Sequence, residues 1–242
     1  MERRPPSRRT KASSSRASSA GASPVGALRD ECERVSEVVR SLDEDAFALP
    51  TRCPPWRVKE LVGHIWRDVD RLRTCFDGPP DEPVEEDAVS YWRSYDPVAD
   101  GPMIADHAKE VADGFTSGRE LARSFADLWP ALIDRAEGED PSRSVRTFGP
   151  VLRLDEFLKT RVLETAVHRL DLLDALGRER SVPPGSAAVV VPVLEALLGS
   201  PLPAALGWTD LEFVETGTGR RAIGTADAAS LADLVERFPL LG

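Results

Sequence analysis

Apolar residues recur at steps of three and four along much of the chain, which is the spacing of one face of an α-helix. The first stripe predicts a helix over residues 27–47, and the second predicts a helix over residues 55–76. Residues 51–55 separate them, and Pro55 suits a first helical turn because its missing N–H is not needed there. The inward positions are Leu28, Cys32, Val35, Val39 and Leu42 in the first helix, and Val58, Leu61, Val62, Ile65, Val69 and Leu72 in the second.

Two further long helices are expected. One covers residues 103–136, with bends near residues 114–118 and at Pro130, and the other covers residues 154–176. The latter ends before Gly177, and glycine is typical of helix C-termini because it adopts a left-handed conformation without strain. Four long amphipathic helices joined by one long and one medium connection predict a mainly α fold, a four-helix bundle over residues 26–180.

The connection over residues 77–101 has a distinct composition, with eight acidic residues, one arginine and four prolines. This predicts a long acidic loop, and long loops in compact domains are usually either functional or disordered. The acidic composition favours a solvated loop. Tyr91, Trp92 and Tyr95 keep open the alternative that the segment forms a lid over a site.

The pattern changes again after residue 183. A short apolar helix is expected over residues 187–198, and a final helix over residues 226–238. Residues 210–214 and 221–223 flank a Thr/Gly-rich turn, which is typical of a β-hairpin. Residues 181–242 are therefore predicted to form a small α/β region after the bundle.

The net charge of −10 is distributed unevenly. Residues 1–24 carry six basic residues and one acidic residue, so they contribute +5 and the rest of the chain −15. So acidic a body is a poor surface for nucleic acid, because phosphates would repel it. The basic segment is rich in Ser, Ala, Arg and Pro and predicts a disordered leader over residues 1–25. Arg8 and Arg9 weakly resemble a twin-arginine export signal, but no apolar stretch follows them, so export is not expected.

Two further observations concern the compartment. The longest apolar stretches fall short of the roughly 18–20 residues that span a bilayer, so no membrane segment is expected. The three cysteines form no CxxC pair, which argues against a disulfide framework or zinc ribbon and indicates a reducing, cytoplasmic location. Cys32 and Cys75 lie on apolar stripes and are expected in the core, while Cys53, just before a helix, is a minor candidate nucleophile.

Candidate chemistry comes from the three histidines, His64, His107 and His168. Glu164 and His168 are four residues apart on a predicted helix, so their side chains share one face. In a bundle, such a pair can meet a histidine of another helix around a shared metal ion. Two imidazoles and one carboxylate would leave zinc an open position, as in catalytic sites. The spacing alone is equally compatible with a surface pair and a core histidine.

Two local sequences are more specific than this spacing. Residues 51–64, TRCPPWRVKELVGH, resemble the opening motif of the mycothiol-dependent maleylpyruvate isomerase family. Residues 161–172, RVLETAVHRLDL, resemble its second motif, and residues 216–220 are more weakly similar to its tail. The resemblance covers about residues 26–180. The family belongs to the DinB-like metalloenzymes, which are four-helix bundles.

The resemblance implies a ligand set and an activity. The positions that match the family's metal ligands are His64, Glu164 and His168, and they would act in catalysis through the metal. The implied cofactors are a divalent metal, zinc first, and mycothiol or a similar thiol as co-substrate. The implied enzyme is an isomerase or S-transferase that acts on an electrophilic small molecule. The Arg-, Ala- and Pro-rich composition fits an actinobacterial source, where mycothiol is the small thiol.

Several roles remain open. Arg161, one turn before Glu164, is a candidate contact for a carboxylate of the substrate or cofactor, or else forms an ion pair. Asp171 or Asp68 is expected to orient a ligand imidazole. His107 is a spare ligand if Glu164 points away.

The alternative function is a non-catalytic, metal-binding regulatory or interaction module, as in DinB-like zinc-containing anti-sigma proteins. The lack of a membrane segment and of an attached regulatory domain argues against it. The expected partners are a small thiol and an electrophilic substrate, with neither nucleic acid nor membrane, in a monomer or homodimer.

Overall fold

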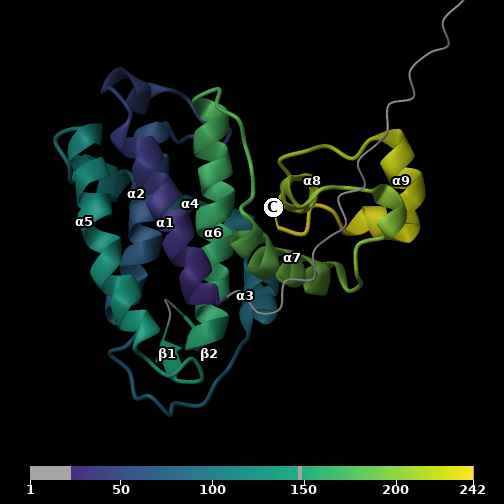
Figure 1. The fold of residues 1–242 in the computed structure, drawn as a ribbon, viewed down its shortest axis with the longest axis horizontal. Coiled ribbons are helices and arrows are strands. Elements are labelled where there is room, and N and C mark those ends of the chain that lie inside the picture. The colour runs from purple at the N-terminus through teal and green to yellow at the C-terminus, as the bar shows by residue number, and fades with distance from the viewer. Residues whose placement is uncertain (1–22, 147–148, 242) are drawn as a thin grey trace, which may run out of the picture.

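The computed structural model describes residues 23–146 and 149–241. Within these ranges the chain forms nine α-helices and one two-stranded sheet, which confirms the mainly α fold class (Figure 1). The predicted leader over residues 1–25 lies almost wholly outside the described residues. No helix in the described ranges is both long and apolar enough to cross a membrane.

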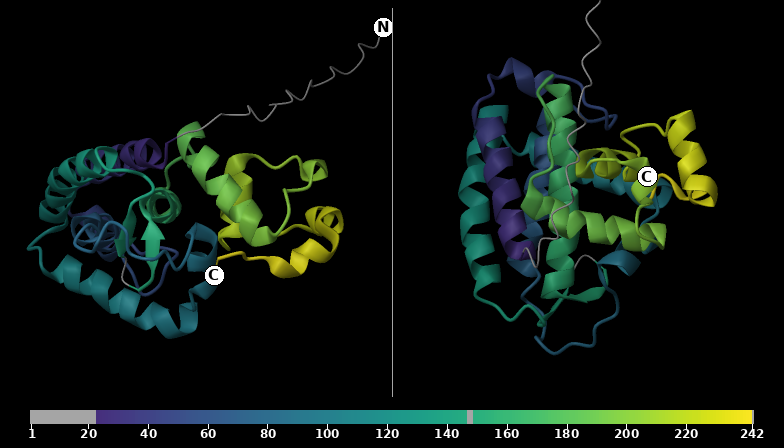
Figure 2. Two further views of the ribbon diagram at one scale, coloured as in Figure 1. Left: turned by 90° about the horizontal axis from the view of Figure 1, so that it is seen from below. Right: turned by 45° about the vertical axis from the view of Figure 1, so that its right-hand side comes forward.

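Four helices form the bundle: α1 (Pro24–Arg40), α2 (Val58–Thr74), α5 (Gly118–Glu137) and α6 (Leu154–Ala175). Figures 1 and 2 show them side by side, with α1 packed on α5 and α6, and α2 packed on the same two helices. The predicted stripes face inward because burial of apolar side chains stabilises the bundle. Fully buried core residues include Leu28, Val35, Leu61, Val69, Phe125, Ile133, Phe157 and Val162.

The predicted start of the second helix at Pro55 is wrong. The helix α2 begins at Val58, because the Glu60 carboxylate accepts a hydrogen bond from the Arg57 backbone N–H at 2.9 Å. This contact satisfies a donor that the first helical turn leaves without a partner. Residues 51–57 therefore form a turn, which carries Cys53 and Trp56 towards the interior of the bundle.

The predicted third helix over residues 103–136 is two helices, α4 (Pro97–Asp113) and α5. The expected bend near residues 114–118 is a full break, because the Ser117 hydroxyl caps α5 by accepting the Glu120 N–H at 3.1 Å. At Pro130 the helix α5 continues without a break. The helix α4 packs closely on α2 at Gly63, where an added Cβ would lie 2.8 Å from the Ala108 carbonyl oxygen. This close approach brings α4 beside His64.

The predicted acidic loop over residues 77–101 is wrong in its second half. It contains α3 (Ala88–Ser94) and the first turn of α4. Two of its acidic residues are helix caps: Asp87 accepts the Ser90 N–H at 2.8 Å, and Asp96 accepts the Val98 N–H at 2.9 Å. Glu156 of α6 holds α3 in place by accepting the Ala88 N–H at 3.1 Å.

The predicted α/β character of residues 181–242 is also wrong, because the described part of this region contains only helices. They are α7 (Pro184–Leu198), α8 (Asp210–Gly217) and α9 (Thr225–Leu231), with 3-10 turns at Ala204–Leu206 and Ala232–Arg237. The expected hairpin is replaced by α8, since Thr209 and Glu212 cap each other's backbone N–H at 3.2 and 2.8 Å.

The sheet lies instead just before α6. Strands β1 (Ser144–Arg146) and β2 (Val151–Arg153) are antiparallel, with Val145 opposite Leu152. This sheet was not among the elements predicted from the sequence, because strands of three residues are too short to show a periodic pattern.

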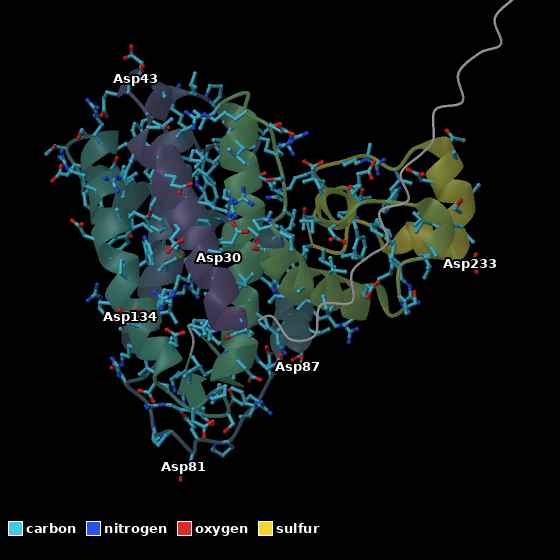
Figure 3. The ribbon with its side chains drawn as sticks, viewed as in Figure 1. Asp30, Asp43, Asp81, Asp87, Asp134 and Asp233 are labelled. Atoms are coloured by element: carbon cyan, nitrogen blue, oxygen red, sulfur yellow. The ribbon has the colours of Figure 1, made fainter. Side chains whose placement is uncertain are left out.

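A buried ion pair within the bundle also contacts the first of the C-terminal helices. Arg169 of α6 donates from Nε to Glu31 of α1 at 2.5 Å, and Ser186 of α7 donates to the same carboxylate at 2.5 Å. The helices α7, α8 and α9 therefore gather on one side of the bundle (Figure 2). Acidic side chains such as Asp43, Asp81 and Asp134 project from the outer surface, in keeping with the acidic net charge (Figure 3).

Candidate metal centre

The structure brings His64, Glu164 and His168 together at the contact between α2 and α6. Each offers one donor atom, and these atoms lie within 4.8 Å of one another. His64 Nε2 is 3.1 Å from Glu164 Oε1, and His168 Nε2 is 3.9 Å from the same oxygen. His64 lies in the middle of α2, while Glu164 and His168 are one turn apart on α6.

This geometry fits a divalent cation. Zinc bonds of about 2.0–2.2 Å at tetrahedral angles place neighbouring donor atoms about 3.3–3.5 Å apart. The two measured separations, 3.1 and 3.9 Å, fall on either side of that value. Two nitrogens and one oxygen also leave a fourth position open, as in catalytic rather than structural zinc sites.

The charges of the three side chains differ in the metal-free protein. Burial lowers the pKa of His64 to about 4, against the hydrogen bond to Glu164. Burial also acts to lower the pKa of His168, yet its hydrogen bonds to Asp171 and Cys53 raise that pKa to about 9. Burial acts to raise the pKa of Glu164, but the His64 hydrogen bond and the His168 charge hold it well below its usual range. A metal ion would therefore have to displace a proton from His168.

Asp171 is the partner of His168. Its Oδ2 lies 2.9 Å from His168 Nδ1, and Arg220 donates from Nε and Nη2 to its two oxygens at 2.8 and 2.7 Å. Asp171 and Asp68 were the two alternatives predicted to orient a ligand imidazole. The structure places Asp171 behind the imidazole and pairs Asp68 with Arg161.

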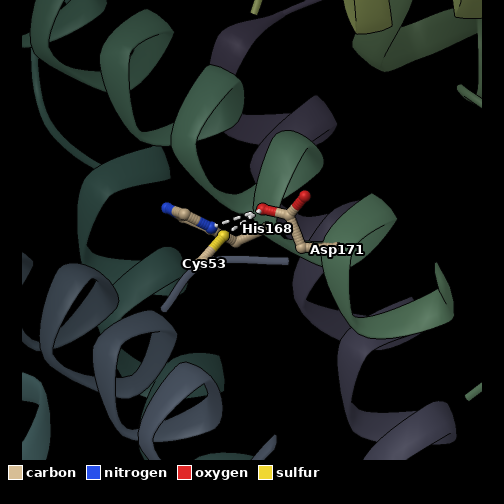
Figure 4. A group of neighbouring side chains, drawn as sticks. All are labelled: Cys53, His168 and Asp171. Carbon is tan, nitrogen blue, oxygen red and sulfur yellow. Dashed lines mark hydrogen bonds and ion pairs between the residues drawn. The ribbon is translucent and has the colours of Figure 1, made fainter. Parts of the chain in front are cut away.

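Cys53, His168 and Asp171 form a second cluster of possible metal ligands, whose donor atoms also lie within 4.8 Å of one another (Figure 4). Cys53 Sγ donates to Asp171 Oδ2 at 3.2 Å. However, Arg220 already pairs with both carboxylate oxygens, and its guanidinium would repel a cation placed there. The Cys53 thiol therefore belongs to the hydrogen-bond network of Asp171, and other residues line the cavity beside the three candidate ligands.

Trp56 packs directly on the histidines. Its ring stacks on His64 with centroids 4.7 Å apart and planes inclined by 29°, and it meets His168 edge-on at 5.9 Å. The two imidazoles are themselves edge to face at 4.7 Å. These contacts restrict rotation of both rings and so fix the positions of two donor atoms.

A cavity of about 260 Å³ opens beside the three donors. The aromatic side chains of the segment expected to be a loop, Tyr91, Trp92 and Tyr95, form one wall of it. His107 of α4 also lines it but lies outside the donor groups found among the described residues. The spare-ligand alternative therefore has no support in this arrangement, because Glu164 points towards the histidines.

Arg161 lines the cavity but is already paired. It is 2% exposed, forms an ion pair with Asp68, and lies 3.4 Å from the Tyr91 hydroxyl. Burial lowers the pKa of Arg161 to about 10. Of the two roles expected for Arg161, the ion pair is the one that the structure contains.

Arg220 is a further residue of the candidate site, one that was not predicted from the sequence. It follows α8 and contacts Asp171, the partner of His168, and with Thr218 and Leu241 it lines one side of the cavity. The available signal was the family-like tail around residues 216–220. Residues of the C-terminal region that lie outside its helices thus complete a candidate site whose proposed ligands all lie in the bundle.

A sequence model of the mycothiol maleylpyruvate isomerase N-terminal domain matches residues 28–173. Uncharacterized proteins from two strains of Mycobacterium tuberculosis are each 28% identical over 156 residues. The match covers 63% of this chain and 56% of each relative, so the chain spans little more than half the length of these relatives.

Two crystal structures resemble the fold. One is the mycothiol-dependent maleylpyruvate isomerase, with a TM-score of 0.46 and 18% identity over 76% of this chain and 71% of that chain. The other is a histidine-to-alanine variant described by the same enzyme name, with a TM-score of 0.47 and 18% identity over 72% of this chain and 68% of that chain.

Proposed function

Because the chain belongs to the mycothiol maleylpyruvate isomerase N-terminal domain family, we propose that it is a metal- and thiol-dependent enzyme. It isomerises an electrophilic small molecule, or transfers a thiol to it. The observation that carries this proposal is the convergence of the His64, Glu164 and His168 donor atoms beside a cavity. The proposed co-substrate is mycothiol or a similar thiol, as the family's name suggests.

The three side chains would hold one divalent cation, with zinc as the first choice for this donor set. When bound, such a cation supplies Lewis acidity and lowers the pKa of a thiol that ligates it. Asp171 accepts the His168 Nδ1–H and so directs Nε2 towards the donor group. The Trp56 ring stacks on the His64 ring and restricts its rotation.

The cavity suits a small substrate. Its volume of about 260 Å³ lies just below the range of about 300–1,000 Å³ common for ligand pockets. Tyr91, Trp92 and Tyr95 present aromatic surface and limit the water in the cavity. Fewer water molecules strengthen the attraction between the arginines of the wall and a charged ligand, because the local dielectric is lower.

The alternative, a metal-binding module without turnover, needs no cavity next to its metal. An open coordination position that faces a cavity favours the enzyme, since a structural zinc site is closed by four protein ligands. Arg220 also favours the enzyme. It lies outside the bundle, yet through Asp171 it orients His168, one of the proposed ligands.

Turnover assays test the proposal. Zinc-loaded protein, mycothiol and a panel of electrophiles that includes maleylpyruvate are expected to give a reaction that needs both metal and thiol. A reaction equally fast without thiol would contradict the proposal. So would a stable protein complex with no turnover on any electrophile, which would favour the regulatory module.

A further inference from the structure

Asp68 lines the cavity one helical turn beyond His64. The two residues are four apart on α2, so their side chains share one face and lie about 6 Å apart along the helix axis. Asp68 is only 4% exposed. Its carboxylate is therefore within reach of a small ligand whose reacting atom lies at the proposed metal centre.

One oxygen of this carboxylate has a protein partner and the other has none. Oδ1 forms an ion pair with Arg161, whereas Oδ2 is buried and accepts no hydrogen bond from any residue that the structure describes. A buried acceptor without a partner is unfavourable, and more so when it belongs to a charged group. A ligand that donates a hydrogen bond to Oδ2 would remove this cost.

Asp68 Oδ2 also differs from the other unpartnered atoms of the cavity wall. Within the described residues those atoms are N–H groups, and they belong to Trp56, Arg67 and Trp92. Glu164 also lines the cavity, but its carboxylate faces the two ligand histidines. Oδ2 of Asp68 is therefore the position on this wall that a hydrogen-bond donor of the ligand would satisfy.

The charges around Oδ2 favour an uncharged donor. Arg161 already pairs with the Asp68 carboxylate, and Arg67 and Arg71 line the same cavity. An ammonium group would add another positive charge among these guanidinium groups, and the low dielectric of a buried site strengthens the repulsion. A hydroxyl or amide group donates a hydrogen bond without that repulsion.

We propose that Asp68 determines the specificity for the thiol co-substrate, because its Oδ2 accepts a hydrogen bond from an uncharged O–H or N–H group of the thiol. This inference rests on the proposed function. The offset of about 6 Å between His64 and Asp68 along α2 places that group a few bonds from the sulfur. A simple alkyl thiol binds more weakly, because a site built to bond a hydroxyl is left with an unpaired buried group when the hydroxyl is missing.

Two thiols of similar size test the inference, mercaptoethanol with its hydroxyl and propanethiol with a methyl group in its place. Each is titrated into cobalt-substituted protein, and the thiolate-to-cobalt charge-transfer band reports binding. We expect mercaptoethanol to bind about 10- to 100-fold more tightly, the usual range for a hydrogen bond to a charged group. Cysteamine, which carries an ammonium group instead, is expected to bind more weakly than mercaptoethanol.

Asp68→Asn is expected to lose this preference. A guanidinium only donates hydrogen bonds, so Arg161 holds the amide oxygen and leaves the NH₂ group in the place of Oδ2. This variant also leaves Arg161 buried without a counter-charge. The double variant Asp68→Leu with Arg161→Met removes both charges and should lose the preference as well. Metal content and thermal unfolding show that each sample is folded and loaded.

Asp70→Asn is the matched control, because Asp70 lies on the same helix but pairs with Arg73 and does not line the cavity. It is expected to keep the wild-type preference. The two thiols differ in acidity, but that difference is common to every variant, so a change in preference reports the side chain. An equal preference in wild type, Asp68→Asn and the double variant would overturn the proposal. So would a wild type that binds cysteamine most tightly.

The inference and the proposed function can fail separately. A preference for mercaptoethanol that depends on Asp68, in a protein that turns over no electrophile, supports the inference and removes the function. Thiol-dependent turnover, with the same relative use of the two thiols in wild type and Asp68→Asn, supports the function and removes the inference.

Discussion

His168 Nδ1 lies 2.9 Å from Asp171 Oδ2, and this contact sets the direction in which the imidazole can bind a ligand. An ionised carboxylate only accepts hydrogen bonds, so Nδ1 carries the proton and Nε2 points towards Glu164. Asp171 is itself fixed by Arg220, which lies 49 residues further along the chain. The C-terminal region thereby orients a proposed metal ligand that belongs to the bundle.

Replacing Asp171 tests this orientation. Asp171→Asn is expected to lower zinc affinity about 10- to 100-fold, the usual effect of losing a carboxylate behind a ligand histidine. Competition with a fluorescent chelator measures the affinity. Asp155→Asn, at the start of the same helix and far from the donor atoms, is the control and should bind zinc normally. Unchanged affinity in Asp171→Asn would show that the hydrogen bond does not position the ligand.

Arg220 should matter through Asp171. Arg220→Gln removes the bidentate pair and is expected to weaken zinc binding several-fold and to lower thiol-dependent turnover. Arg220→Lys keeps the charge but not the paired geometry, so we expect it to restore only part of the affinity. Arg178→Gln is the matched control, because Arg178 is exposed and donates to Ser41 instead. Normal zinc affinity in Arg220→Gln would contradict this prediction, because it would show that Arg220 does not influence the proposed metal site.

Metal binding should release protons. At pH 6 the metal-free protein holds a proton on His168, whose pKa is about 9, and none on most His64 side chains, whose pKa is about 4. Because zinc binds neutral imidazole, we expect about one proton released per zinc at pH 6. Zinc affinity should rise as the pH increases from about 5 towards 9 and level off above the pKa of His168. Titrations in buffers of different ionisation enthalpy count the protons, and zero release would contradict this assignment of charge.

The buried ion pair between Glu31 and Arg169 is expected to contribute much of the stability that the packing of α7 on the bundle provides. Arg169→Met leaves the Glu31 carboxylate buried and unpaired, so we expect a loss of about 3–5 kcal/mol in the free energy of unfolding. Urea titration followed by circular dichroism measures it. The double variant Glu31→Met with Arg169→Met removes both charges and should recover part of the loss. A single variant as stable as the wild type would mean that α7 is held by its apolar face alone.

The bundle could be predicted because its helices bury one face each. The apolar stripe that contains Leu61, Ile65 and Val69 predicted most of α2, and Gly177 predicted the end of α6. The helix α3 and the start of α4 were missed because Asp87 and Asp96, which cap these two helices, add to an acidic composition typical of loops. The helix α8 was mistaken for a strand because its start depends on the mutual cap of Thr209 and Glu212.

The candidate ligands could be predicted, but their surroundings could not. The spacing of Glu164 and His168 places both on one helix face, and the two motifs indicated His64. Whether Asp68 or Asp171 supports an imidazole depends on the rotation of α2 relative to α6, which spacing does not determine. The contact between Arg220 and Asp171 depends on how the C-terminal region folds back on the bundle, so no local pattern reveals it.

The most direct test of the metal centre is elemental analysis of purified wild type, His168→Ala and His107→Ala, with thiol added to cobalt-substituted samples. We expect about one metal ion per chain in the wild type and in His107→Ala, loss of the metal in His168→Ala, and a thiolate-to-cobalt charge-transfer band only where the metal is held. A folded His168→Ala variant with full metal content, or a wild type that binds no metal, would contradict the account.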